Sequence, residues 1–316
     1  MGKLTYLRPR RGDIRPVLLL LTSHRLDCFL ICIRCLERFT DFSRLKHVYV
    51  VANALSPEHL AMARRFVSRH DNASLVERGP RGLVPAVHAA QNEILANHLE
   101  DVIIKIDEDL FVTPHWLEHL VDGYIDHADR PDVPLVMPLV PVSPPGRHVL
   151  NRFLRVSYPS ERHMYCGPPI EENWVYHRWM WEKILHENLA EVYLRDAPAK
   201  YGYVGYLTIN CVIFDGRLMR RVLPFPTTPT AGQPTTDEKA INLALATDHM
   251  KVAVLGRSLA HHYSFSKCED YLRSHVPLEA VWRYMQGIAE APLAAGRRCR
   301  APVGGATELT LLRAGT

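Results

Sequence analysis

The stretch "VIIKIDEDLFVTPHW", Val102 to Trp116, joins a short apolar run to three consecutive acidic residues. The apolar run indicates a strand that is covered on both faces. Asp107, Glu108 and Asp109 follow directly at its carboxyl end. Because open α/β sheets bind ligands outside the carboxyl ends of their strands, this position favours a functional site at the three acids.

The segments around this stretch alternate between the two kinds of secondary structure. In the first half of the chain we expect apolar strands at 15–23, 45–53, 73–78 and 101–106. Amphipathic helices are expected between them, at 26–39, 57–70 and 86–98. This alternation predicts an α/β protein with a mainly parallel central sheet flanked by helices. The second half is less regular: we expect strands at 133–142, 203–214, 251–255 and 258–265, a proline-rich turn at 143–146, and helices at 171–189 and 235–249.

Composition narrows the class of protein. The 316 residues carry a formal net charge of +4, which is too small to indicate nucleic-acid binding. No apolar run approaches the ~18 residues of a membrane span. The seven cysteines are an odd number, and three of them, Cys28, Cys32 and Cys35, fall on one face of a predicted helix, as buried thiols would. Disulfides are not indicated, so a reducing, cytoplasmic location is expected. The basic N-terminus, with Lys3 and Arg8 among its charges, is either a solvated leader or a contact with an anionic membrane surface.

The acids at 107–109 have three interpretations. They could form a solvated turn, or cap the helix that follows Thr113-Pro114, although they lie too early in the chain for a cap. They could also bind a hard divalent cation, which takes oxygen ligands from one or two carboxylates and from substrate phosphates. The buried strand before them favours the cation site, but a D-x-D pattern alone is a weak motif.

Neighbouring motifs strengthen the third interpretation. The first strand ends in "TSHR", Thr22 to Arg25, a helix carries Asn92 at the usual distance before Asp107, and "VTPHWLEHLV" follows the acids. Together these features, which cover about residues 15–125, resemble the inverting GT-A glycosyltransferases of the family-2 type. The resemblance implies a Rossmann-like GT-A sheet, a nucleotide-sugar donor (a UDP- or GDP-sugar) and a divalent cation, Mn²⁺ or Mg²⁺.

The resemblance also assigns roles to single residues. Asp109 would ligate the metal, Asp107 would hold the ribose or a metal-bound water, and Glu108 would face away. Thr22, Arg25 and Asn92 would lie at the nucleotide. The family often reads the base with an Asp after the second strand, and this sequence has Asn53 there.

A second acid pair, Asp237 and Glu238, begins a predicted helix. The pattern Thr235-x-x-Glu238 indicates a capping box. The resemblance also implies a general base at such a helix start, so either Asp237 or Glu238 would be that base, and we favour Asp237. Both interpretations can hold together.

The histidines of "SLAHHYSF" are candidate metal ligands. Because side chains alternate along a strand, only one of His261 and His262 can face the site, and we favour His262. An imidazole ligand beside carboxylates would favour Mn²⁺ over Mg²⁺.

The region between these motifs is rich in aromatic side chains that either pack in the core or stack on acceptor sugars. They are Trp174, Tyr176, Trp179, Trp181, Tyr201, Tyr203 and Tyr206. The resemblance therefore divides one GT-A domain into a nucleotide-sugar-binding half (15–125) and an acceptor-binding, catalytic half (126–286). We expect a flexible leader at 1–14 and a poorly ordered tail at 287–316.

The leading hypothesis is a metal-dependent hexosyltransferase that moves a sugar to a hydroxyl of a glycan, glycoconjugate or small molecule, with inversion. A nucleotidyltransferase of similar fold is a second possibility, but "TSHRLDCF" lacks the glycine-rich loop typical of such enzymes. A binding module without activity is a third, and it predicts the loss of a ligand or base that this sequence retains.

Overall fold

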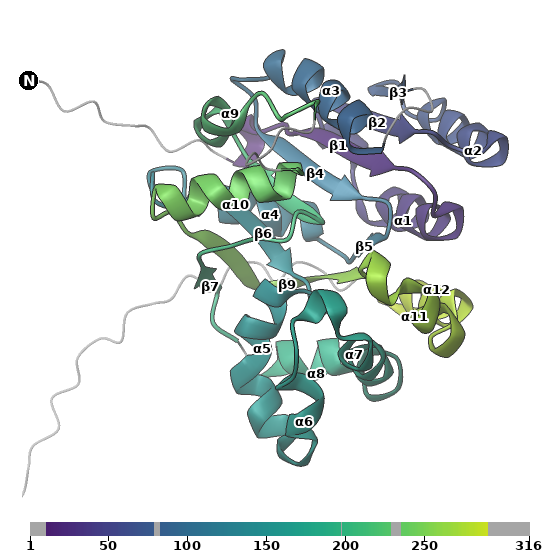
Figure 1. Cartoon of the computed structure of the whole chain (residues 1–316), viewed down its shortest axis with the longest axis vertical. Helices are drawn as coiled ribbons and strands as arrows, with labels where there is room; N and C mark the ends of the chain where they lie inside the picture. The colour runs from purple at the N-terminus through teal and green to yellow at the C-terminus, as the bar shows by residue number, and fades with distance from the viewer. Residues whose placement is uncertain (1–10, 79–82, 197, 229–234, 290–316) are drawn as a thin grey trace, which may run out of the picture.

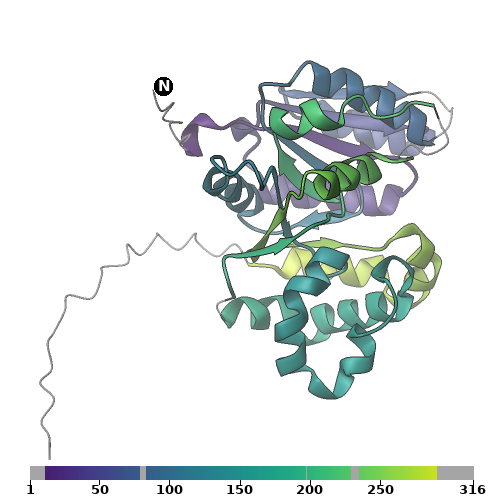
Figure 2. The same ribbon diagram turned by 60° about the vertical axis from the view of Figure 1, so that its left-hand side comes forward.

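The computed structural model describes residues 11–78, 83–196, 198–228 and 235–289. Within these ranges the chain forms one nine-stranded sheet with the order β3-β2-β1-β4-β8-β6-β9-β5, and β7 pairs with β9. Helices flank the sheet, as Figures 1 and 2 show. The predicted α/β class with a mainly parallel central sheet is confirmed.

The first half of the chain builds the parallel part of the sheet. Strands β1 (Val17–Thr22), β2 (His47–Asn53), β3 (Ala73–Arg78) and β4 (Ile103–Asp107) run in the same direction. Helices α1 (Leu26–Phe39), α2 (Pro57–Val67) and α3 (Leu83–Ala96) connect them. The carboxyl ends of β1, β2 and β4 therefore meet at one edge, where the acids begin.

The second half adds antiparallel strands to this sheet. Strand β8 (Cys211–Phe214) lies antiparallel between β4 and β6 (Leu135–Leu139), and β9 (Val252–His262) runs parallel to β6. The short β5 (Leu110–Val112) pairs antiparallel with β9, with Leu110 opposite His262. This pairing brings the end of β9 beside the acids that precede β5.

The remaining helices fall into two groups. Helices α4 (Trp116–Asp126), α9 (Gly216–Val222) and α10 (Asp237–Thr247) lie beside the sheet. The second group lies at the end of the molecule opposite β1–β3 in both views. It contains α5 (Pro144–Ser157), α6 (Arg162–Tyr165), α7 (Trp174–Glu187) and α8 (Leu189–Arg195). Helices α11 (Glu269–His275) and α12 (Leu278–Gly287) pack against α7.

Two sequence predictions about this half are wrong. The proline-rich turn begins helix α5: the Ser143 hydroxyl accepts a hydrogen bond from the Gly146 amide at 3.0 Å, and the prolines occupy the first turn, where no N–H is needed. The expected strand 203–214 is divided between β7 (Tyr201–Val204) and β8, which pair at different places in the sheet. The loop between them passes beside α10, where Asn242 bonds both backbone groups of Leu207.

The predicted leader and tail lie partly outside the described residues, namely 1–10 and 290–316. Residues Arg11–Asp13 form a 3₁₀ turn and Ile14 is buried, so the end of the predicted leader is folded. The cysteines that the structure describes are free thiols, and those of α1 are buried. None of the described helices combines the length and the apolar character that a membrane span requires.

Candidate active site

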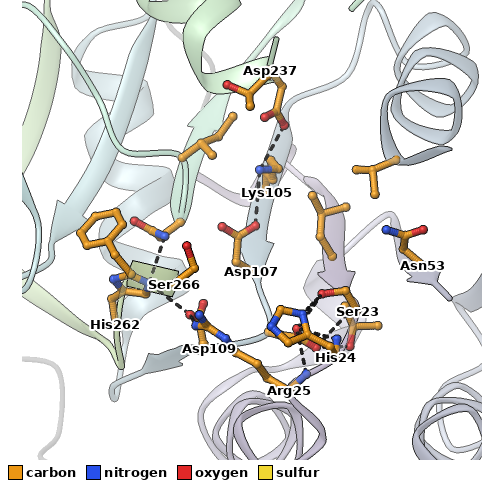
Figure 3. A pocket seen from close by; sticks show the side chains of 18 of the residues that line it. Ser23, His24, Arg25, Asn53, Lys105, Asp107, Asp109, Asp237, His262 and Ser266 are labelled. Carbon is orange, nitrogen blue, oxygen red and sulfur yellow. Dashed lines mark hydrogen bonds and ion pairs between the residues drawn. The ribbon is translucent and has the colours of Figure 1, made fainter. Parts of the chain in front are cut away.

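A cavity of about 360 Å³ lies at the carboxyl ends of β1, β2 and β4. The start of α10 and the segment after β9 also border it, so residues distant in sequence meet in this cavity (Figure 3). Seven of the site residues predicted from the sequence line this cavity: Thr22, Arg25, Asn53, Asp107, Asp109, Asp237 and His262. Lining residues that the sequence analysis gave no role include Ser23, His24, Lys105, Asn210, Ser264, Phe265 and Ser266.

Asp109 and His262 form one side of the cavity. The Nε2 atom of His262 lies 3.2 Å from Asp109 Oδ2, and the Tyr263 amide donates to the Asp109 carbonyl at 2.9 Å. Both side chains are almost fully buried. Burial alone raises the pKa of Asp109, but His262 and Arg25 outweigh it and hold that pKa below its usual value. An ionised carboxylate therefore lies next to an imidazole nitrogen.

Lys105 lies between two other acids on the floor of the cavity (Figure 3). Its Nζ atom is 3.4 Å from Asp107 Oδ1 and 3.2 Å from Asp237 Oδ2. Burial raises the pKa of Asp107 to about 6 despite the opposing effect of Lys105. Burial also acts to raise the pKa of Asp237, but Lys105 and the Gln91 amide reverse the effect and lower it. Asp237 is therefore ionised at neutral pH.

Glu108 holds the loop that follows β1. Its carboxylate accepts hydrogen bonds from the Thr22 hydroxyl at 2.6 Å and from the Ser23 amide at 2.9 Å. It also accepts from the His24 and Arg25 amides, each at 3.3 Å. By the family resemblance, Glu108 was expected only to face away from the metal. In the structure, the hydrogen bonds of Glu108 fix the loop that carries Arg25.

Arg25 reaches across the cavity from this loop. Its guanidinium forms ion pairs with Asp109 and with Glu269, the latter at 2.7 Å, and donates to the Ser264 carbonyl at 2.9 Å. Asn53 lines the cavity from the end of β2 and is also buried. Both therefore line the cavity, and their contact with a nucleotide stays a prediction.

Two predicted residues of the donor and metal sites lie elsewhere. Asn92 does not line this cavity, because its side-chain amide bonds the Phe225 backbone in both directions, at 2.7 and 2.8 Å. His261 faces the other side of β9, between Trp181 and Tyr284. Strand alternation separates it from His262, so His262 lines the cavity and His261 does not.

Glu238 also has a different position from its neighbour Asp237. Its carboxylate accepts from the Ile209 amide at 3.0 Å, which fixes the segment before β8, and it does not line the cavity. The expected capping box is shifted by one residue: Thr236 caps α10 by accepting from the Lys239 amide at 3.1 Å. The structure therefore leaves Asp237 as the acid of this pair that reaches the cavity.

The candidate acceptor aromatics do not line this cavity. Tyr176, Trp179 and Trp181 are buried core residues. Trp174, Tyr203 and Tyr206 are 45%, 41% and 41% exposed, so they remain available to a larger acceptor. Phe265 is the aromatic residue that reaches the cavity itself.

The side chains present can supply part of a metal shell. Among the residues that the structure describes, no group of three or more His, Cys, Asp or Glu side chains is placed to hold an ion. Asp109 and His262 nevertheless offer an oxygen and a nitrogen donor side by side, which suits Mn²⁺. Phosphate oxygens of a substrate commonly supply further ligands to such a cation. The donor set therefore fits a cation held jointly with a diphosphate.

The sequence matches no protein-family model and no curated protein sequence. Solved structures do resemble the chain. The mannosyltransferase PcManGT from Pyrobaculum calidifontis, in complex with GDP-Man and Mn²⁺, aligns at a TM-score of 0.50 and 15% identity. GalNAc-T7 with UDP, GalNAc and Mn²⁺ aligns at a TM-score of 0.50 and 10% identity.

The alignments cover 82% and 80% of this chain but only 59% and 45% of the two solved chains. The chain therefore corresponds to about half the length of those proteins. At 10–15% identity the likeness establishes the architecture alone. The chain has the GT-A fold, the fold of these two glycosyltransferases.

Proposed function

We propose that this chain is a metal-dependent glycosyltransferase that moves a sugar from a nucleotide-sugar to an acceptor hydroxyl with inversion. One observation carries the proposal: a single cavity holds the Asp109–His262 donor pair and the ionised Asp237. The two solved structures of the same fold contain Mn²⁺ with GDP-Man, or Mn²⁺ with UDP and GalNAc, which supports a donor of this class.

The donor would bind along the edge formed by β1, β2 and β4. Asn53 and the loop 22–25 would contact the nucleoside, and Asp107 would hold the ribose. Asp109 and His262 would ligate the cation. When bound, such a cation stabilises the negative charge that grows on the leaving diphosphate.

Asp237 would act as the general base. It lies across the cavity floor from the motif acids, and Lys105 keeps it ionised so that it can accept a proton. The acceptor oxygen would attack the anomeric carbon while its proton passes to Asp237 and the bond from the sugar to the diphosphate breaks. A single displacement of this kind inverts the anomeric centre.

The nucleotidyltransferase alternative receives less support from the loop after β1. Phosphate-cradling loops present free backbone amides to the ligand. Here the amides of Ser23, His24 and Arg25 all point to the Glu108 carboxylate, which would also repel a phosphate. The glycosyltransferase proposal needs no such cradle.

Binding and turnover of a donor panel test this proposal. UDP- and GDP-sugars would be titrated into the protein with and without Mn²⁺, and hydrolysis or transfer would be followed by release of the nucleoside diphosphate. Metal-dependent binding of one donor, lost in Asp109→Ala, is the expected result. Absence of binding to every donor under both conditions would refute the proposal.

A further inference from the structure

The guanidinium of Arg25 rests on the carboxylate that the proposed cation would use. Arg25 is 6% exposed, and its Nη1 atom contacts both Asp109 and the Ser264 carbonyl, the latter at 2.9 Å. Its Nη2 atom lies 2.7 Å from Glu269 Oε2. The side chain is therefore fixed in place by acceptors from three segments, namely the Asp109 turn, the segment after β9 and the start of α11.

A guanidinium and a divalent cation compete for such a carboxylate. The Oδ2 atom of Asp109 that contacts Arg25 is also the atom nearest His262 Nε2, at 3.2 Å. A cation held by Asp109 and His262 would therefore meet the guanidinium of Arg25 as a second positive charge beside it. Because both charges are buried, solvent screens their repulsion poorly.

The structure also offers Arg25 another partner. If the contact between Arg25 Nη1 and Asp109 broke, the contact between Arg25 Nη2 and Glu269 would still hold the guanidinium. A diphosphate entering the cavity would supply acceptors for the released side, since guanidinium groups bind phosphates in a bidentate manner. Glu269 is itself anchored by Arg273 at 2.8 Å, so it would remain in place.

We propose that Arg25 is an internal counter-ion that competes with the divalent cation for Asp109. Its release by the donor's diphosphate makes cation and donor bind cooperatively. In the absence of a nucleotide, Arg25 keeps the metal affinity low. This inference rests on the proposed metal-dependent function and adds to it a coupling between cation and donor binding.

Binding of Mn²⁺ alone to the full chain tests the competition directly. Electron paramagnetic resonance measures free Mn²⁺ in titrations of the wild type and of Arg25→Gln, each with and without UDP or GDP. Without nucleotide, we expect Arg25→Gln to bind Mn²⁺ about tenfold more tightly than the wild type, a coupling of ordinary size. With nucleotide, the wild type should gain affinity and the variant should gain much less.

A second variant changes the competition in the opposite direction. Glu269→Gln removes the alternative carboxylate, so Arg25 would rest more firmly on Asp109 and Mn²⁺ affinity without nucleotide should fall. Arg64→Gln breaks an exposed ion pair with Glu77 outside the cavity and should leave Mn²⁺ binding unchanged. Circular dichroism would show that each variant is folded.

The outcomes separate this inference from the proposed function. In one outcome, the wild type and Arg25→Gln bind Mn²⁺ equally well without nucleotide, and both bind Mn²⁺ when UDP or GDP is present. This result would overturn the competition and leave the metal-dependent function standing. No Mn²⁺ binding by either protein, even with UDP or GDP, would overturn both.

Discussion

The Lys105 ammonium lies 3.2 Å from the Asp237 carboxylate, although 132 positions of sequence (237 − 105) separate the two residues. Lys105 is buried within a strand whose other residues are mostly apolar. An unpaired charge there would be costly, so the pairs with Asp107 and Asp237 explain how the strand accommodates it. The same pairs set the ionisation of the proposed base.

Replacement of Lys105 by methionine should therefore move the pH profile. Lys105 lowers the pKa of Asp237, so Lys105→Met raises that pKa and the base becomes protonated at a higher pH. We expect the acid limb of kcat/KM to shift upward and activity at pH 7 to fall roughly 10- to 100-fold. Profiles from pH 5 to 9 measure the shift. Lys46→Met, which breaks a more exposed pair with Asp101, is the control, and an unchanged profile in Lys105→Met would contradict the expectation.

Asp237 and Glu238 should differ in their effects. Asp237→Asn removes the proton acceptor, and we expect kcat to fall about 10²- to 10⁴-fold with little change in donor affinity. Glu238→Gln keeps an acceptor for the Ile209 amide and should retain most activity. Kinetics and donor binding by calorimetry distinguish the two. Equal damage from both substitutions would argue that the acid pair acts only through the structure of α10.

Much of the fold could be predicted from sequence because its strongest signals are local. The parallel strands β1 to β4 are apolar runs bounded by helices, and each was expected close to its observed position. Helix α5 was missed because two prolines and a glycine also describe a turn, and only the Ser143 cap distinguishes them. The division of 203–214 depends on contacts with α10, which no local pattern contains.

The site residues differ in the same way: some could be predicted from neighbouring sequence, and others depend on contacts with residues far along the chain. Strand alternation predicted that His261 and His262 face opposite sides, and in the structure only His262 of the two lines the cavity. Asp107 and Asp109, which were selected by their position at the strand end, line it as well. Lys105 was missed, although a lysine inside an apolar strand is a signal that it needs a buried acidic partner. Asn92 was misplaced because its partner, the Phe225 backbone, lies far along the chain.

Glu108 should contribute to stability as well as to the position of Arg25. Glu108→Ala would leave the hydroxyl of Thr22 and the amides of residues 23–25 without their charged acceptor. Hydrogen bonds to charged groups are worth more than neutral ones, so we expect a loss of about 2–3 kcal/mol in the free energy of unfolding. Urea denaturation measures it. Glu100→Ala removes an exposed ion pair with Arg220 and should change the free energy of unfolding little. An equal loss of stability in Glu100→Ala and Glu108→Ala would refute a special stabilising role of Glu108.

His261 should make stability depend on pH in the mildly acidic range. Burial lowers its pKa to about 4 from an ordinary value of 6.5. As the pH falls from 6.5 towards 4, the unfolded chain binds a proton that the folded chain does not, so stability decreases, by up to about 1.4 kcal/mol per pH unit. Above pH 6.5 both states are neutral and His261 adds no pH dependence.

His261→Phe removes this titration while keeping an aromatic ring between Trp181 and Tyr284. Urea midpoints at pH 7.5 and pH 5 should therefore differ less in this variant than in the wild type. His163→Gln changes an exposed histidine and should retain the wild-type difference. An identical pH dependence in the wild type and His261→Phe would show that another buried group, such as His177, whose pKa burial also lowers to about 4, accounts for the acid sensitivity.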